Sequence, residues 1–260
     1  MNTIKKQKNE TECSLTNVQD WNTYYYGRDL KKLAMLKSPI DTFICGTKGK
    51  IFELGCGGSP NLARSALFGW DVGGIDFNSN GIELIKTYLS STSVATELIS
   101  NDIFSCDLDV VKEKYDLLIS MGFLEHFKNP QQILIKWKHI VKDDGKIFTL
   151  IPNLYSVNAC LMKKFDQELW LQHVCYTPFE MDEFHKAAGL VPLVAAHYSG
   201  RYDLHMLIPW DKICRKINNR TIFKTVKYFS SYVVENVLKL ISDRNNKYFN
   251  SFITGVYQRE

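Results

Sequence analysis

The feature that most constrains this chain is a short apolar strand that runs directly into a cluster of glycines, KIFELGCGGS at residues 50–59. Apolar residues alternate with polar neighbours as far as Leu54, which predicts a buried strand. Pro60 then fixes a backbone angle suited to the first turn of a helix. Glycines at the mouth of a strand allow close approach of a ligand, and the next helix directs its free N–H groups there. We therefore expect a nucleotide-like ligand at residues 55–59, the alternative being a simple tight turn.

A second strand supports the ligand-binding alternative. The sequence WDVGGID ends in Asp76, about 20 residues after the glycines, which is the spacing that places a carboxylate on ribose hydroxyls in a strand–helix–strand unit. The dinucleotide fingerprint G-x-G-x-x-G would require a third glycine at Pro60. Its absence argues against a nicotinamide or flavin cofactor and leaves another ribose-bearing ligand.

Strand-like and helix-like segments alternate through the first half of the chain. Strands are expected at 50–55, 71–76, 94–99, 115–121 and 146–152, and helices at 60–69, 79–89, 107–113 and 129–141. This alternation predicts a parallel sheet that is covered on both faces. Ligands of such sheets bind at the carboxyl ends of the strands, so four segments should meet there: 53–59, 76–77, 101–104 and 120–126.

Composition limits the partners and the compartment. The chain has 260 residues, of which 45% are hydrophobic and 23% charged, as expected for one large globular domain or one domain with an insert. The net charge of +4 is modest, so we expect no nucleic-acid partner. Seven cysteines without a C-x-x-C pair are typical of reduced thiols. The polar start MNTIKKQKNETE and the lack of a long apolar run predict a cytoplasmic protein.

Five segments between residues 45 and 155 carry a family resemblance. In order they read ELGCGGSP, GIDF, NDIF, YDLLISMGFLEHF and GKIFTLIPN, and they resemble the successive motifs of class I S-adenosylmethionine-dependent methyltransferases, in particular the branch that acts on small molecules. The resemblance implies an α/β, doubly wound, seven-stranded and mostly parallel Rossmann-like sheet. Residues 249–257 fit its final antiparallel strand. Ser59 stands where the family often has a third glycine, and S-adenosyl-L-methionine is the implied cofactor.

The resemblance also implies which residues hold the methionine part of the cofactor. Gly55, Cys56 and Gly57 would lie beneath it, with Cys56 serving as a small space-filling residue. Glu53 would hold the ammonium group through water. Ser120 would offer a backbone carbonyl near the same group.

The adenosine part would be held by the next two strand ends. The resemblance places Asp76 on the ribose hydroxyls and Phe77 beside the adenine. Asp102 and Ile103 would meet the adenine edge. Independently of the family, acids at strand ends suit a ligand that carries hydroxyl and amine donors and two positive charges.

The core is expected at residues 46–199 and 249–260, preceded by a tail and helical cap at 1–45. Aromatic residues gather in this cap. One interpretation is an aromatic cluster packed on the edge of the domain. The other is a lid in which Tyr26 and Arg28 close over the cofactor, with Arg28 pairing its carboxylate.

Two further segments are expected to cover the substrate. Residues 153–177 form a long, aromatic-rich connection that we interpret as lid-like. A helix over 178–188 and a strand over 190–197 should follow. Residues 200–248 form a basic insert with an amphipathic helix at 221–242. That helix could pack on the core or on a second subunit, or it could contact an anionic membrane surface or an anionic substrate. Either a monomer or a homodimer fits.

Three residues are candidates for catalysis of methyl transfer. A hydroxyl acceptor must lose its proton, and His126, at the carboxyl end of the fourth strand, is the first candidate for the base. His173 is the second, because the lid could deliver it. Glu125 could orient the acceptor or His126. The predicted function is methyl transfer to an oxygen or nitrogen of a small-molecule or sugar-like acceptor.

Two alternatives remain at this point. Leu124-Glu125-His126 with His173 faintly resembles metal-dependent RNA 2′-O-methyltransferases, which bind their metal through Glu-x-x-Glu-His. Gly122 stands where the first glutamate should be, so we expect no metal. The other alternative is a non-catalytic module that binds S-adenosylmethionine.

Overall fold

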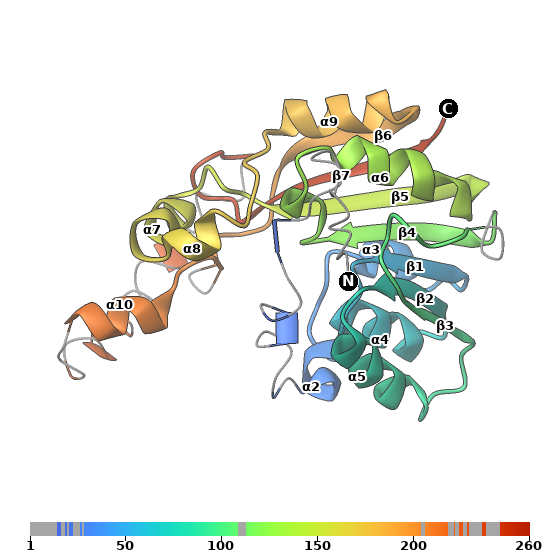
Figure 1. The fold of residues 1–260 in the computed structure, drawn as a ribbon, viewed down its shortest axis with the longest axis horizontal. Helices are drawn as coiled ribbons and strands as arrows, with labels where there is room; N and C mark the ends of the chain where they lie inside the picture. Colours follow the sequence, from blue (N-terminus) through green and yellow to red (C-terminus); the bar gives the residue numbers. More distant parts are fainter. Residues whose placement is uncertain are drawn as a thin grey trace, which may run out of the picture.

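A seven-stranded sheet with the strand order β3-β2-β1-β4-β5-β7-β6 runs through the computed structural model (Figure 1). The five strands β1 to β5 pair in parallel, whereas β7 is antiparallel to both of its neighbours. The strands are β1 Lys50–Leu54, β2 Asp71–Asp76, β3 Thr96–Ser100, β4 Tyr115–Met121, β5 Val141–Pro152, β6 Leu190–Ser199 and β7 Phe252–Arg259. The predicted fold class, including the antiparallel last strand, is confirmed.

The structure describes residues 15–16, 19, 21–22, 27, 29–108, 113–203, 206–217, 221, 224–225, 228, 236–237 and 245–260. Within these residues, no helix combines the length and the apolar character that crossing a membrane requires.

Helices cover both faces of the sheet (Figure 1). The helices are α2 Leu30–Ala34, α3 Asp41–Ile44, α4 Pro60–Leu67, α5 Ser79–Leu89, α6 Pro130–Trp137, α7 Val157–Phe165, α8 Gln167–Trp170, α9 Pro178–Ala187 and α10 Trp210–Ile217, with 3₁₀ turns η1 Leu124–His126 and η2 Lys138–Ile140. Of these, α7, α8 and α10 lie beyond one end of the sheet (Figure 1). Neighbouring side chains of a strand point to opposite faces. Leu118 of β4 therefore packs in the core that contains α6 and α9, and Leu117 in the core that contains α4 and α5. Burial on both faces explains why these strands are apolar throughout.

Several predicted boundaries were wrong. The strand expected at 146–152 begins at Val141, and it does so through a register shift against β4. Val141 had been expected to end a helix, and no element had been predicted for residues 142–145. The helix expected at 107–113 is absent from the described residues 107–108 and 113. The long connection at 153–177 contains α7 and α8. Most of the helix expected at 221–242 lies outside the described residues.

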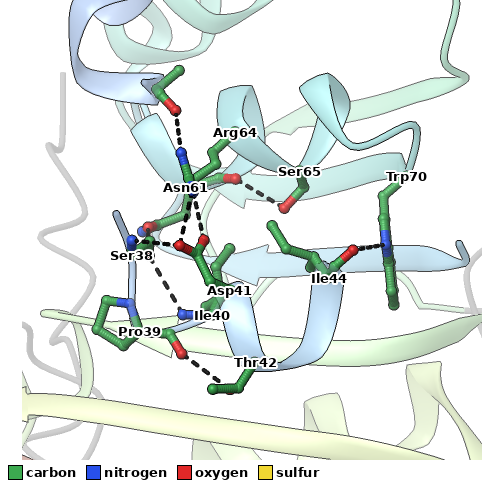
Figure 2. A network of polar contacts seen from close by, with 11 residues as sticks. Ser38, Pro39, Ile40, Asp41, Thr42, Ile44, Asn61, Arg64, Ser65 and Trp70 are labelled. Atoms are coloured by element: carbon green, nitrogen blue, oxygen red, sulfur yellow. Dashed lines mark hydrogen bonds and ion pairs between the residues drawn. The ribbon is translucent and has the colours of Figure 1, made fainter. Parts of the chain in front are cut away.

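The segment before the sheet is fixed to the first helix of the glycine loop, as Figure 2 shows. Arg64 of α4 forms a two-pronged ion pair with Asp41, one prong of which measures 2.8 Å, and also donates to the carbonyl of Ala34 at 3.0 Å. Ser38 donates to the side chain of Asn61 at 2.8 Å. The pKa of Asp41 is lowered by its hydrogen bond to the guanidinium. Residues 30–44 are thereby held against the helix that begins at the candidate site.

Candidate active site

A cavity of about 990 Å³ lies at the carboxyl ends of β1, β2 and β4. The loops after these strands form its floor. Its other walls come from Leu150 and Pro152 of β5 and from three further segments: Thr16, Gln19 and Trp21 near the N-terminus, residues 166–173 around α8, and Asp203, Met206, Leu207 and Lys212 before and within α10. The position agrees with the rule for open α/β sheets.

The glycine loop that follows β1 can be built only from small residues. Gly55 has a φ of +67°, and a Cβ added to it would lie 2.2 Å from the ring of Phe123. The backbone N–H of Gly57 donates to Oδ2 of Asp76 at 2.8 Å, and that of Cys56 donates to the carbonyl of Ile75 at 3.0 Å. The loop is therefore tied to the end of β2, and its backbone faces the cavity without side chains in the way.

The helix after the loop begins at Pro60, as predicted, and is capped by Ser59. The Ser59 hydroxyl oxygen accepts from the backbone N–H groups of Asn61 and Leu62, each at 3.1 Å. The same hydroxyl donates to the carboxylate of Glu53. A protein side chain thus satisfies N–H groups that a phosphate would otherwise use. The arrangement favours a ligand other than a phosphate at this loop.

Two buried acids border the cavity at this end. Glu53 is 3% exposed and Asp76 is 8% exposed. Burial raises the pKa of Glu53 to about 8, although hydrogen bonds from Ser59 and Asn61 act in the opposite direction. Burial likewise raises the pKa of Asp76 to about 6, against backbone hydrogen bonds from Asn78 and Gly57. A cation or a hydroxyl donor entering the cavity would stabilise the ionised form of both acids.

A smaller cavity of about 50 Å³ adjoins the glycine loop. Its walls include Phe77, Ile103 and Phe104, and its rim carries Asp76 and Asp102. Asp102 accepts the backbone N–H of Phe104 at 2.8 Å, which fixes the turn after β3. Apolar walls with carboxylates at the rim suit a flat aromatic base that bears an amine.

A second polar group lines the main cavity after β4. Glu125 and His126 lie in η1, and His173 follows α8. Nε2 of His126 is 3.9 Å from Oε1 of Glu125, and the two imidazole rings have centroids 4.6 Å apart. One ligating atom from each of the three residues lies within 4.8 Å of the others. We call these three residues the η1 cluster.

Burial governs the protonation of the η1 cluster. It lowers the pKa of His126 to about 4, with a further contribution from the charge of His173, and it lowers the pKa of His173 as well. It raises the pKa of Glu125 to about 8. Oε2 of Glu125 has no hydrogen-bond partner, although Glu125 is only 2% exposed. At neutral pH both rings are neutral, and each can accept a proton or bind a cation.

Segments distant in the sequence hold the η1 cluster together. The backbone N–H of Val174 donates to the carbonyl of Glu125 at 2.7 Å, and that of Leu15 donates to the carbonyl of His126 at 3.0 Å. The ring of Trp21 meets the His126 ring edge-on at 5.5 Å. These contacts explain how His173, 47 positions along the chain, reaches η1.

Not every predicted site residue lines a cavity. Gly57 contributes through its bond to Asp76, and Cys56 borders the main cavity while its thiol, whose pKa is raised by burial, lies near Gly74. Ser120 is 1% exposed and borders neither cavity, and its hydroxyl has no partner among the described residues. Tyr26 and Arg28 lie outside the described residues.

Sequence reasoning missed the role of Phe123 and Phe127. Both residues border the two cavities, and their ring centroids are 4.9 Å apart. The signal was present in GFLEHF, whose aromatic residues flank the polar pair Glu125-His126. Lys37 and Lys212, which also line the main cavity, come from segments without a recognisable pattern.

Comparisons with known proteins agree with this geometry. Residues 52–149 match the profile of the methyltransferase domain family. A ubiquinone biosynthesis O-methyltransferase of Pectobacterium atrosepticum is 24% identical over 157 residues, which cover 58% of this chain and 64% of that protein. The match therefore spans a little less than two thirds of this curated relative.

Solved structures share the fold at low sequence identity. A SAM-dependent methyltransferase from Archaeoglobus fulgidus has a TM-score of 0.60 at 12% identity, with 94% of this chain and 100% of that chain covered. The cyclopropane synthase MmaA2 from Mycobacterium tuberculosis has a TM-score of 0.59 at 13% identity, with 94% and 99% covered. The predicted fold is confirmed, and the match of residues 52–149 to the methyltransferase domain family agrees with the predicted resemblance. A methyltransferase and a cyclopropane synthase share this fold, so the fold does not determine the methyl acceptor.

Proposed function

We propose that this chain, which carries a class I S-adenosylmethionine-dependent methyltransferase domain, transfers the methyl group to a hydroxyl oxygen of a small molecule. The observation that carries the proposal is that one cavity is lined both by the acids Glu53 and Asp76 and by the η1 cluster. The first pair suits the cofactor. The second group suits an acceptor that must lose a proton.

The residues at the strand ends fit the cofactor that the family implies. Asp76 lies beside the glycine loop and would bind the ribose hydroxyls, while the smaller cavity between Phe77 and Ile103 would take the adenine, with Asp102 near its amine. Glu53 would attract the ammonium group. The Phe123 ring packs against Gly55, where any Cβ would clash with it, and both residues line the two cavities.

The η1 cluster would receive the acceptor hydroxyl. When bound, the cofactor supplies a methyl group on a positively charged sulfur. Nδ1 of His126 is 2.7 Å from the carbonyl of Gln172, so this nitrogen carries the proton and Nε2 is free to accept one. Nε2 of His126 would take the proton of the acceptor hydroxyl, so that the acceptor oxygen could receive the methyl group. His173 and Glu125 would hold the hydroxyl in place.

The walls of the cavity favour a small acceptor. Trp21 from the N-terminal segment, Leu169 from α8 and Met206 before α10 all line the main cavity. We propose that the segments 1–45, 153–177 and 200–248 act as a cover over the core at 46–199 and 249–260. A covered cavity admits a small hydroxyl compound more readily than an RNA strand.

The test is a turnover assay with radiolabelled cofactor and a pool of phenols, catechols and sugar alcohols. Release of S-adenosylhomocysteine that depends on the added acceptor, with a methyl ether as product, would support the proposal. Cofactor binding without turnover on any acceptor would favour the non-catalytic alternative. Methylation of RNA in place of small molecules would favour the other alternative.

A further inference from the structure

The η1 cluster has the composition of a metal site. It combines two imidazoles and one carboxylate, and one ligating atom of each lies within 4.8 Å of the others. All three side chains line the main cavity. A zinc ion bonded at roughly 2.0–2.2 Å holds its ligand atoms about 3.3 Å apart. The three groups would therefore need to draw together by no more than about 1.5 Å.

Both histidines are oriented as metal ligands usually are. Nδ1 of His126 lies 2.7 Å from the carbonyl of Gln172, and Nδ1 of His173 lies 2.8 Å from the carbonyl of Leu169. A metal-binding histidine commonly donates its other N–H to a backbone carbonyl, which fixes both the tautomer and the direction of the ring. Here the fixed tautomer leaves Nε2 of each ring with a free electron pair.

The carboxylate of Glu125 is a second, independent indication that the η1 cluster binds a cation. Glu125 lines the cavity and is 2% exposed, and its Oε2 has no hydrogen-bond partner among the residues that the structure describes. A buried polar atom without a partner is unfavourable in free energy. A cation bound between this carboxylate and the two imidazoles would remove that cost.

We propose that Glu125, His126 and His173 bind a divalent cation of the zinc type, with a position left open toward the cavity. Two nitrogen donors favour zinc and its first-row neighbours over magnesium or calcium, which prefer oxygen ligands. The expectation of no metal rested on Gly122, which leaves one carboxylate fewer than a four-ligand site needs. Three protein ligands with an open position are, however, what catalytic zinc sites use.

The consequence for chemistry rests on the proposed function, although the metal site itself does not. A hydroxyl bound at the open position would have its pKa lowered by the cation, so its proton could leave to water and not to His126. The acceptors favoured are then hydroxyl compounds with a second oxygen that can share the cation, such as catechols.

The experiment is a titration of the chelator-stripped full chain with zinc alone, followed by calorimetry in competition with a chelator of known affinity. The wild-type protein and His139→Gln, an exposed histidine in η2 at the opposite end of the sheet, are expected to bind one zinc per chain. His173→Gln is expected to bind at least about 100-fold more weakly. Equal affinities for His173→Gln and the wild type would overturn the proposal, as would the lack of stoichiometric binding.

Cobalt(II) added to the wild-type protein makes the test independent of how the variants fold. Intense visible bands of a four- or five-coordinate ion support the site, and the weak spectrum of the aqueous ion overturns it. Binding is read without any acceptor. A chain that transfers methyl groups but binds no zinc therefore overturns this inference alone, and one that binds zinc but transfers no methyl group overturns the proposed function alone.

Discussion

Two buried glutamates line the cavity, Glu53 near the glycine loop and Glu125 in the η1 cluster. They are equally buried but differ in their hydrogen-bond partners. Glu53 is 3% exposed and Glu125 is 2% exposed, and burial raises the pKa of each to about 8. Glu53 receives side-chain hydrogen bonds from Ser59 and Asn61. Glu125 keeps one oxygen without any partner.

The difference teaches how the two halves are built. Glu53, Ser59 and Asn61 come from one strand–loop–helix segment, so the protein itself completes their polar contacts before a ligand arrives. Glu125 lies near His173, which comes from a distant segment, and its Oε2 has no hydrogen-bond partner among the described residues. The polar contacts of Glu53 are therefore formed without a ligand. The η1 cluster, in contrast, could form further contacts with an acceptor or a cation.

The largest effect is expected at the η1 cluster. His126→Gln should lower the turnover number by about 10²- to 10⁴-fold, because the acceptor hydroxyl loses the base that takes its proton or, when the cation is bound, a ligand of the cation that lowers the pKa of that hydroxyl. Affinity for S-adenosylhomocysteine, measured by calorimetry, should stay within about twofold. The control is His139→Gln, which should leave both quantities unchanged. An equal loss of turnover and of cofactor affinity would contradict the assignment of the η1 cluster to the acceptor and of the region around Glu53 to the cofactor.

Gly55→Ala should weaken cofactor affinity by at least about 30-fold, if the strain is relieved by moving the loop away from its binding position. The new Cβ would lie 2.2 Å from the Phe123 ring in a backbone with φ of +67°, and overpacking of this kind costs about 1–3 kcal/mol beyond the cost of the conformation itself. Gly46→Ala is the matched control, since its φ is +77° but its Cβ would meet nothing within 4 Å. If calorimetry gives the two variants the same cofactor affinity, the contact between Gly55 and Phe123 is not needed for cofactor binding.

Asp76→Ala should lower cofactor affinity by about 10- to 150-fold, since a hydrogen bond to a charged group contributes roughly 1.5–3 kcal/mol. Asp71→Ala, at the other end of the same strand, removes an acid that accepts from Ala95 and should leave affinity unchanged. Calorimetry with S-adenosylhomocysteine gives both values. Unchanged affinity in Asp76→Ala would contradict the ribose assignment.

Cofactor affinity should rise with pH by about tenfold or more between about pH 6 and pH 8. In the free protein the pKa of Glu53 is about 8 and that of Asp76 about 6, both above their ordinary values. The folded chain thus holds protons that the unfolded chain releases, and its free energy of unfolding falls as pH rises from about 4.5 to 8. A bound ammonium group favours the ionised carboxylate and opposes this loss.

The measurement for this pH effect is the shift in melting temperature caused by the ligand, taken across the pH range. Glu53→Gln should flatten the profile, because the residue with the higher pKa has been removed. If the ligand-induced shift in melting temperature varies with pH in the same way for the wild type and Glu53→Gln, ionisation of Glu53 is not coupled to ligand binding.

The smallest effect is expected at Ser120. Its hydroxyl, like Oε2 of Glu125, is buried without a partner, but it borders no cavity. Ser120→Ala should change the free energy of unfolding by less than about 0.5 kcal/mol and leave cofactor affinity unchanged. Ser156→Ala, which removes the N-cap of α7, should cost about 0.5–2 kcal/mol. A large loss of cofactor affinity in Ser120→Ala would give the hydroxyl a role that its position does not suggest.

Sequence patterns predicted the core well because its segments are periodic and apolar. The bounds of β2, β4 and α5 were predicted to the residue, and Pro60 was identified as the start of α4. The prediction failed where polarity and structure disagree. The strand β5 begins at Val141, where a helix had been expected to end, and the polar residues 142–145 lie within a register shift against β4.

The sequence by itself determined the parallel sheet, the glycine loop and the acids at the strand ends, because each depends on neighbouring residues. Only the tertiary structure decided that His173 lies beside His126 and that Glu125 keeps an unpartnered oxygen. It also decided that Ser120 lies away from both cavities. The physical reason is that local patterns fix strand order and helix starts, whereas a contact between segments 47 positions apart depends on how the cover packs on the core.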